Sequence, residues 1–245
     1  MIRVLVNGAH GRMGRLACEA IEKSGDLALV GRAGRGDPLA RSIAESGAEV
    51  VVDFTLPAVA LDHALTIVAA GAAPVIGTSG LDGAALQQLA AACTAARRGG
   101  IVAPNFAIGA VLMMRFAELA ARHLRHAEIV EAHHAGKVDA PSGTAAATAA
   151  RMAAARAAAG VAPGAVAGGG PARGETRDAI AIHSIRLPGV VAEQSVLLGE
   201  VGQKLEIRHV AYSREAYMPG VLLACRKVGA LDRLVVGLDA LLFPA

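Results

Sequence analysis

The sequence predicts an α/β protein made of two domains of different kinds. Over residues 2–103, short aliphatic runs alternate with helical patterns, and each run ends in glycine or small polar residues. Strands that alternate with helices form a parallel sheet with right-handed crossovers. Between residues 179 and 211, three strand-like runs follow one another with only glycine-containing turns between them, which predicts an antiparallel or mixed sheet. We therefore expect a parallel-sheet domain followed by an α+β domain.

Composition agrees with a globular protein that has an aliphatic core. Hydrophobic residues make up 54% of the 245 residues and aromatic residues only 2%, and this length allows one large domain or two small ones. The formal charge of +3 lacks the clustered Lys and Arg of a nucleic-acid-binding protein. Three widely spaced cysteines fit a reducing compartment, and we expect neither a secretion signal nor a membrane-spanning helix. We therefore expect a cytoplasmic protein that binds neither nucleic acid nor membrane.

The first domain is predicted to span residues 1–105 and to be joined by residues 214–245. Its strands are expected at residues 2–6, 27–33, 49–54, 73–76 and 100–103, with helices between them that end near Gly25, Ala70 and Ala96. Ligands of such sheets bind at the carboxyl ends of the strands. The segments that follow the strands, at residues 8–14, 54–55, 77–80 and 104–105, are therefore expected to lie along one rim and to form a cofactor groove.

A glycine-rich turn follows the first strand and leads directly into a helical pattern. Its spacing is G-x-x-G-x-x-G, formed by Gly8, Gly11 and Gly14, with His10, Arg12 and Met13 between them. Glycine permits a tight turn and a close backbone approach, and the helix N-terminus offers free N–H groups to a pyrophosphate. The turn therefore predicts a Rossmann-like dinucleotide site. A glycine-rich turn without a ligand is the alternative.

The end of the second strand bears on which dinucleotide would bind. An NAD site usually has an acid there that accepts from the ribose 2′-OH, whereas this chain has Gly34 followed by Arg35, with Arg32 nearby. An arginine without an adjacent acid suits a 2′-phosphate, and therefore NADPH. Two alternatives stay open: the arginines are solvated loop residues, or Asp37 serves as the acid because the loop folds back.

The second domain is predicted at residues 106–213. A helix at 109–124, a strand at 126–134, a helix at 144–159 and a long loop at 160–176 are expected first, and strands at 179–187, 190–198 and 204–211 follow. A helix from residue 214 to about 228 and the tail at 231–242 are expected to return to the first domain. Sheets of this second kind often build oligomer interfaces, so we expect a homo-oligomer.

Residues 131–145 have an unusual density of ionisable groups and read EAHHAGKVDAPSGTA. His133 and His134 can exchange protons near neutral pH, but on an extended chain they face opposite ways. Lys137 is one of four lysines in a chain that otherwise uses arginine. Ser142-Gly143-Thr144 opens an alanine-rich helix, where hydroxyl and free N–H groups suit an anion.

Each of these residues also has a simpler explanation. Taken singly, they are surface histidines, a solvated lysine and a serine that only caps its helix, but their combination favours a site. A metal site has little support, because lysine is a poor ligand, no i,i+4 histidine pair is present and the cysteines are remote. A serine nucleophile has little support either, since no elbow sequence surrounds Ser142. We expect no metal.

These motifs resemble, in order, those of the 4-hydroxy-tetrahydrodipicolinate reductase (dihydrodipicolinate reductase) family over nearly the whole chain. They are GAHGRMG at 8–14, DFTLP at 53–57, GTSG at 77–80, PNF at 104–106, the 131–145 motif, and GQKLEIRH at 202–209. The 131–145 motif is very specific and the glycine turn much less so. The resemblance implies NAD(P)H-dependent reduction of a cyclic imine diacid, formed from aspartate semialdehyde and pyruvate. It also implies the diaminopimelate route to lysine and a homotetramer in the bacterial cytoplasm.

The resemblance further implies a role for each site residue. His133 would donate a proton, and Lys137 would assist it and hold the intermediate. The residues that would bind the substrate carboxylates are His134, Ser142, Gly143 and Thr144. Those that would line the cofactor are Gly8, Arg12 and Met13 at the pyrophosphate, and Gly77, Thr78, Ser79, Pro104, Asn105 and Phe106 near the nicotinamide. His10, Gly11 and Phe54 are candidates through their place in the same motifs.

The family often has an acid at the end of the second strand, where this chain has Gly34 and then Arg35. That departure favours NADPH, with NADH still possible. Two other functions remain open. One is another imine or carbonyl reductase on the same scaffold, such as an aspartate dehydrogenase-like enzyme, which would not need a site for two carboxylates. The other is a non-catalytic dinucleotide-sensing regulator, which would bind NADPH without turnover.

Overall fold

The structure is a computed structural model that describes residues 1–78, 80–165 and 170–244. Its described residues form two compact units. Unit 1 consists of Met1–Ile108 and the stretch that starts at Arg214, and unit 2 consists of Gly109–Ser213. Unit 1 is therefore built from two separate stretches of chain, whereas unit 2 is continuous.

Unit 1 contains a six-stranded parallel sheet with the strand order β11-β5-β4-β3-β1-β2. The elements of its first stretch are β1 (Ile2–Asn7), α1 (Arg12–Glu22), β2 (Leu27–Ala33), α2 (Leu39–Ser46), β3 (Val50–Asp53), α3 (Pro57–Ala69), β4 (Ala73–Ile76), α4 (Gly83–Ala95) and β5 (Gly100–Val102). Those of its second stretch are η2 (Arg214–Tyr217), α7 (Met218–Val228), β11 (Leu234–Val236) and α8 (Asp239–Leu242). The predicted parallel sheet is confirmed, and its order reverses between β1 and β3.

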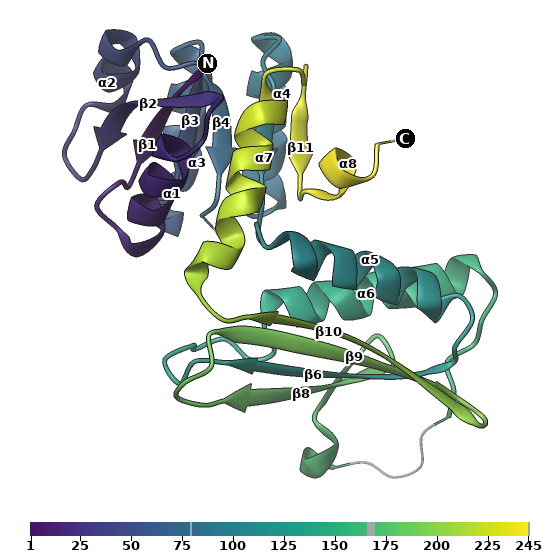
Figure 1. Cartoon of the computed structure of the whole chain (residues 1–245). Helices are drawn as coiled ribbons and strands as arrows, with labels where there is room; N and C mark the ends of the chain where they lie inside the picture. The colour runs from purple at the N-terminus through teal and green to yellow at the C-terminus, as the bar shows by residue number, and fades with distance from the viewer. Residues whose placement is uncertain (79, 166–169, 245) are drawn as a thin grey trace. The chain divides into compact units, whose positions relative to one another are not determined.

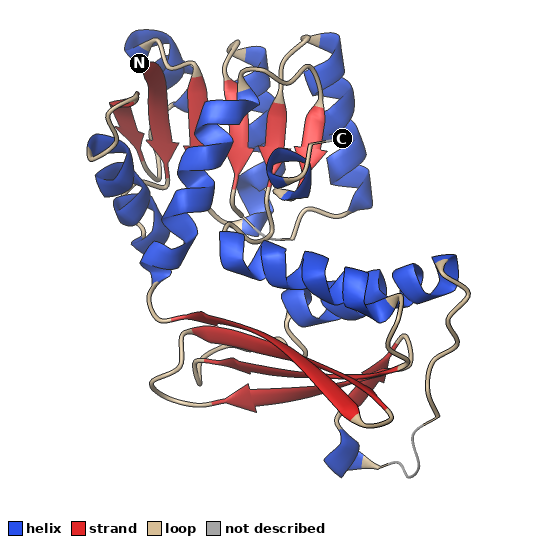
Figure 2. Cartoon of the chain, turned by 45° about the vertical axis from the view of Figure 1, so that its right-hand side comes forward, coloured by secondary structure: helices blue, strands red, loops and turns tan. Residues whose placement is uncertain are grey.

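Helices cover both faces of this sheet, as Figures 1 and 2 show. α1 contacts α7 on one face, while α3 contacts both α2 and α4 on the other. Every residue of β3 and β4 is buried, which is why Val50–Val52 and Ala73–Ile76 are continuous apolar runs rather than alternating patterns. The short helix α2 lies between Pro38 and Gly47 and was not predicted. The tail was predicted only to return to this domain, and it adds the edge strand β11.

Unit 2 contains a five-stranded mixed sheet with the strand order β10-β9-β6-β8-β7. Its elements are α5 (Ile108–Ala121), β6 (His126–His133), α6 (Gly143–Ala158), η1 (Pro171–Arg173), β7 (Glu175–Arg177), β8 (Ile180–Arg186), β9 (Ala192–Glu200) and β10 (Gln203–Ala211). β6 and β8 are parallel, and the other neighbours are antiparallel. α5 and α6 cover one face (Figure 1). The stretch predicted as a loop at 160–176 contains η1 and begins β7.

The covered face of this sheet changes from apolar to polar along β6. Ile129 is fully buried with its register partners Ile182 and Val196. Because side chains alternate along a strand, Glu131 and His133 point to the same face as Ile129. The polar end of this face therefore lies where β6 leads into the 131–145 motif.

Candidate active site

A cavity of about 550 Å³ lies in unit 1. It is lined by Asn7, Gly8, His10, Gly11, Gly34, Arg35, Gly36, Asp37, Leu39, Phe54, Thr55, Leu56, Val59 and His63. These residues come mainly from the segments that follow β1, β2 and β3, so the cavity opens at the carboxyl ends of these strands, as expected for a parallel sheet.

The glycine turn shapes the cavity in a way that other residues would not allow. Gly8 has φ +76°, and a Cβ on it would lie 2.7 Å from the carbonyl oxygen of Phe54. A Cβ on Gly14 would lie 2.1 Å from the carbonyl oxygen of Gly8. No side chain caps α1, whose N-cap is Gly11, so its first N–H groups are available to an anion. The turn and the cavity fit the pyrophosphate of a dinucleotide.

The loop after β2 places Arg35 and Asp37 at the same cavity. An Asp37 carboxylate oxygen accepts a hydrogen bond from the Gly34 N–H at 2.8 Å. The loop after β2 therefore does fold back, but this Asp37 oxygen is engaged by the backbone of the same loop. Arg32 forms an exposed ion pair with Glu22 and does not line the cavity among the described residues. Arg35 is the arginine that the cavity can use for a phosphate.

A buried carboxylate holds three strand ends together beside the cavity. Asp53 is fully buried and accepts hydrogen bonds from the Asn7 side chain at 2.7 Å and from the Thr55 hydroxyl and N–H at 2.7 and 3.0 Å. His63 Nδ1 lies 3.1 Å from its second oxygen, and the Thr78 hydroxyl donates to its first at 3.2 Å. Asn7, Asp53 and His63 were not predicted as site residues.

Two phenylalanine rings crowd the segment after β4. A Cβ on Gly77 would lie 2.2 Å from the Phe54 ring and 2.9 Å from the Phe106 ring. The two rings pack edge to face with their centroids 5.9 Å apart. Glycine is therefore required at residue 77. The predicted cofactor residues that do not line the cavity, among those described, are Arg12, Met13, Gly77, Thr78, Pro104, Asn105 and Phe106. Ser79 lies outside the described residues.

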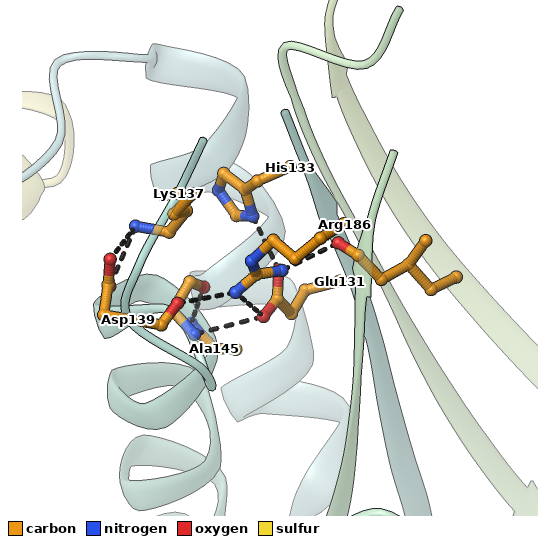
Figure 3. A network of polar contacts seen from close by, with 8 residues as sticks. Glu131, His133, Lys137, Asp139, Ala145 and Arg186 are labelled. Carbon is orange, nitrogen blue, oxygen red and sulfur yellow. Dashed lines mark hydrogen bonds and ion pairs between the residues drawn. The ribbon is translucent and has the colours of Figure 1, made fainter. Parts of the chain in front are cut away.

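In unit 2, a buried glutamate holds His133 (Figure 3). Glu131 is fully buried, and one of its carboxylate oxygens lies 2.6 Å from His133 Nδ1. Arg186 from β8 donates to both oxygens, at 2.9 and 3.0 Å. The Ser142 N–H donates to the second oxygen at 3.2 Å. Figure 3 shows the other ring nitrogen of His133 turned away from Glu131.

These contacts determine the charge states of the pair. Burial alone would raise the pKa of Glu131, but hydrogen bonds from Arg186, Ser184 and His133 outweigh it and hold the pKa below its ordinary value. Burial lowers the pKa of His133, a change that the hydrogen bond and charge of Glu131 only partly offset. The free protein near neutral pH therefore holds an ionised Glu131 beside a neutral His133, which donates its Nδ1–H to the carboxylate.

The rest of the motif lies at the N-terminus of α6. The Ser142 hydroxyl accepts from the Ala145 N–H at 3.2 Å, so the predicted cap is confirmed. A Cβ on Gly143 would meet nothing within 4 Å, so the space beside it is open. Lys137 Nζ lies 2.7 and 2.8 Å from the two carboxylate oxygens of Asp139. His134 is exposed and belongs to none of these contacts.

Two features are absent from the residues that the structure describes. No cluster of three His, Cys, Asp or Glu side chains among them is arranged to hold a metal ion. No helix in that part of the chain is long and apolar enough to span a bilayer.

Family comparisons cover almost the entire chain. A family model described as "Dihydrodipicolinate reductase, N-terminus" matches residues 2–106, and one described as "Dihydrodipicolinate reductase, C-terminus" matches residues 109–242. The chain belongs to the dihydrodipicolinate reductase family. The 4-hydroxy-tetrahydrodipicolinate reductase of Coxiella burnetii (strain Dugway 5J108-111) is 46% identical over 241 residues, which are 98% of this chain and 99% of that protein. The enzyme of the same name from Legionella pneumophila (strain Corby) is 45% identical over 240 residues, 98% and 99% of the two chains.

A solved structure of the family also matches the fold closely. Dipicolinate-bound dihydrodipicolinate reductase from Paenisporosarcina sp. TG-14 superposes with a TM-score of 0.87 and 36% identity, covering 98% of both chains. An aspartate dehydrogenase from Thermotoga maritima has a TM-score of 0.50 and 10% identity, so it shares the fold alone. The dihydrodipicolinate reductase family is thus supported by both sequence and structure, and its N-terminal domain carries a nicotinamide cofactor site.

Of the predicted site residues, the structure brings two groups together within their own units. Gly8, His10, Gly11, Arg35 and Phe54 line the cavity of unit 1. In unit 2, Ser142 caps α6 and its N–H donates to Glu131, which also contacts His133. The loop that contains Lys137 lies beside them (Figure 3). Arg186 was not predicted as a site residue because no local sequence signal marks it. Glu131 could be recognised as the first residue of the motif, but its burial could not be predicted from the sequence.

Proposed function

We propose that this chain reduces 4-hydroxy-tetrahydrodipicolinate, a cyclic imine diacid, to tetrahydrodipicolinate with NADPH in the diaminopimelate pathway to lysine. The observation that carries the proposal is the buried Glu131–His133 pair next to the Ser142–Thr144 helix N-terminus. It joins a proton-transfer group to an anion site in a chain of this family. We place the cofactor in unit 1 and the substrate in unit 2, in a cytoplasmic homotetramer.

The residues of unit 1 would hold the cofactor. The N–H groups of the glycine turn and of the α1 N-terminus would bind its pyrophosphate, and Arg35 would bind the 2′-phosphate. Phe54 and the segments at 77–79 and 104–106 would flank the nicotinamide, with Ser79 outside the described residues. When bound, the nicotinamide supplies a hydride to the substrate.

The residues of unit 2 would bind the diacid and supply the proton. Hydride addition leaves electron density that must accept a proton, and His133 Nε2 is the atom assigned to this transfer. Glu131 holds the other ring nitrogen, so the ring is oriented before the substrate arrives. Lys137, once released from Asp139, would bind a carboxylate and assist the proton transfer. His134 and Ser142-Gly143-Thr144 would bind the carboxylates as well. The dipicolinate-bound relative supports a small dicarboxylate as the ligand.

The test is a coupled assay with freshly made condensation product, in which the loss of NADPH absorbance is followed. Turnover is expected with this diacid and not with monocarboxylate imines or oxaloacetate plus ammonia. An aspartate dehydrogenase-like enzyme would give the opposite substrate pattern. A dinucleotide-sensing regulator would bind NADPH and consume none of it, and either result would reject the proposal.

Arg35→Ala is expected to lower kcat/KM for NADPH by about 10–100-fold, as for a lost hydrogen bond to a charged group. The value for NADH is expected to stay the same, because NADH has no 2′-phosphate. Steady-state kinetics with both cofactors at low salt measure this. Arg32→Ala is the matched control, since Arg32 is an exposed arginine of β2, three residues before Arg35, that pairs with Glu22. A clearly higher wild-type kcat/KM for NADH than for NADPH would show that the cofactor preference is wrong.

The pH dependence of turnover is expected to differ between kcat/KM and kcat. A proton donor must be protonated, so both parameters fall as pH rises through the pKa of His133. In the free enzyme, burial lowers this pKa, whereas two substrate carboxylates nearby would raise it. The falling limb of kcat is therefore expected at higher pH than that of kcat/KM. Identical limbs in the two profiles would contradict the assignment.

A further inference from the structure

Arg186 connects three parts of unit 2 that the sequence keeps apart. It is the last residue of β8 and the register partner of His133 in the parallel β6–β8 pair. Its guanidinium donates to both oxygens of Glu131, at 2.9 and 3.0 Å. It also donates to the backbone carbonyl of Asp139 at 2.6 Å. One side chain thus ties β8 to β6 and to the loop that precedes α6 (Figure 3).

Each of the two Glu131 oxygens contacts Arg186 and, in addition, either His133 or the Ser142 N–H. The oxygen that faces His133 Nδ1 accepts from one guanidinium nitrogen, and the oxygen that faces the Ser142 N–H accepts from another. A planar, bidentate guanidinium restricts the rotation of the carboxylate about its last bond. The carboxylate therefore presents one fixed oxygen to His133 and the other to the start of α6.

The arrangement is not one that stability alone favours. Arg186 Nε is buried and has no hydrogen-bond partner among the described residues. A buried donor without a partner costs free energy. The Arg186 guanidinium thus donates to Glu131 and Asp139 through its two terminal nitrogens, while its Nε–H has no partner among the described residues. This is expected if the guanidinium serves to orient the Glu131 carboxylate.

We propose that Arg186 is a positioning residue that, through Glu131, holds His133 in the Nδ1–H tautomer and fixes the distance from His133 to the Ser142 helix terminus. The inference rests on the proposed role of His133 as proton donor, but the tautomer can be measured without substrate. In the Nδ1–H tautomer, Nε2 is the nitrogen that can take up a proton and pass it to the substrate. Without Arg186, the Glu131 carboxylate can rotate, and both tautomers become accessible.

The experiment compares wild type, Arg186→Met and Arg186→Lys after ¹⁵N labelling of histidine, with a His133→Gln spectrum to assign the signal. His133 is expected as the Nδ1–H tautomer in wild type and as a mixture in Arg186→Met. The same variant is expected to lower kcat by about 10–100-fold, the range known for loss of the outer groups that orient metal-binding histidines, with the NADPH dissociation constant unchanged. Arg186→Lys keeps the charge but cannot span both oxygens, so it is expected to restore only part of kcat.

Arg125→Met is the matched control. Arg125 also forms a bidentate pair with a glutamate of unit 2, at 3.0 and 2.7 Å from the two oxygens of Glu200, but it contacts no residue of the motif. Its variant is expected to keep both the tautomer and kcat. The inference is overturned if His133 stays in the Nδ1–H tautomer in Arg186→Met, or if Arg125→Met shifts it equally. An inactive wild type would instead reject the proposed function, whatever the tautomer.

Discussion

His133→Ala is expected to lower kcat by about 10²–10⁴-fold, the range for loss of a general acid, while the fold persists. The side chain is 16% exposed, and its Nδ1 is committed to Glu131. Removing it therefore takes away the one ring nitrogen that can reach a substrate and leaves the backbone of β6 in place. Steady-state kcat, the far-UV circular dichroism spectrum and the NADPH dissociation constant are the measurements.

The matched control for this variant is His183→Ala. His183 also pairs with a glutamate of β6, since its Nε2 lies 2.8 Å from an oxygen of Glu128, but the pair lies outside the motif. Its loss is expected to leave kcat close to that of wild type. Wild-type-like turnover in His133→Ala would remove His133 from the mechanism.

Glu131→Gln is expected to destabilise unit 2 by about 3 kcal/mol, because it leaves Arg186 without its countercharge. The value lies at the low end of the range for broken buried pairs, since the Arg186 side chain is still 19% exposed. Urea unfolding of wild type and variant at neutral pH measures the difference. Glu128→Gln is the control. This variant breaks the ion pair between His183 and Glu128, whose side chain is 30% exposed. It is expected to lower the free energy of unfolding by about 1 kcal/mol or less.

The same comparison has a defined pH dependence. Because the folded state lowers the pKa of Glu131, its stabilising contribution is complete above the ordinary value of 4.5. It is lost as pH falls through the lower folded-state pKa. The stability difference between wild type and Glu131→Gln is therefore expected to shrink in acid. A difference that stays constant down to the acid unfolding of the protein would show that the charge of Glu131 is not what stabilises unit 2.

The parts of the fold that the sequence predicted are those with a local signal. Val50–Val52 and Ala73–Ile76 are continuous apolar runs, and Ser142 follows a proline and precedes an alanine-rich run, so each can be recognised within a few residues. α2 was missed because it has only eight residues. β7 was missed because its three residues, Glu175–Arg177, are all exposed and polar and so lack the alternation of a half-buried strand.

The parts of the site that could not be predicted depend on strand register. Arg186 is 55 residues from Glu131, and Asn7 is 46 residues from Asp53. Both contacts exist because two strands pair in one register, and a shift by one residue would turn each side chain to the opposite face. A single sequence carries no direct record of that register. The motif therefore indicated the candidate groups for proton transfer and anion binding, but not the residues that hold them in place.

The return of the chain to unit 1 has a consequence for how the protein is made. β11 pairs with β5, and α7 contributes fully buried residues such as Val221 and Cys225. The ribosome therefore completes all of unit 2 before it supplies the last strand and helix of unit 1. Unit 1 therefore cannot complete its fold before unit 2 has been synthesised, unlike a domain made of one continuous N-terminal stretch. During that interval β5 lacks its pairing partner β11, and the apolar surface that α7 later buries is exposed to solvent. Unpaired strand edges and exposed apolar surface are the features that chaperones bind.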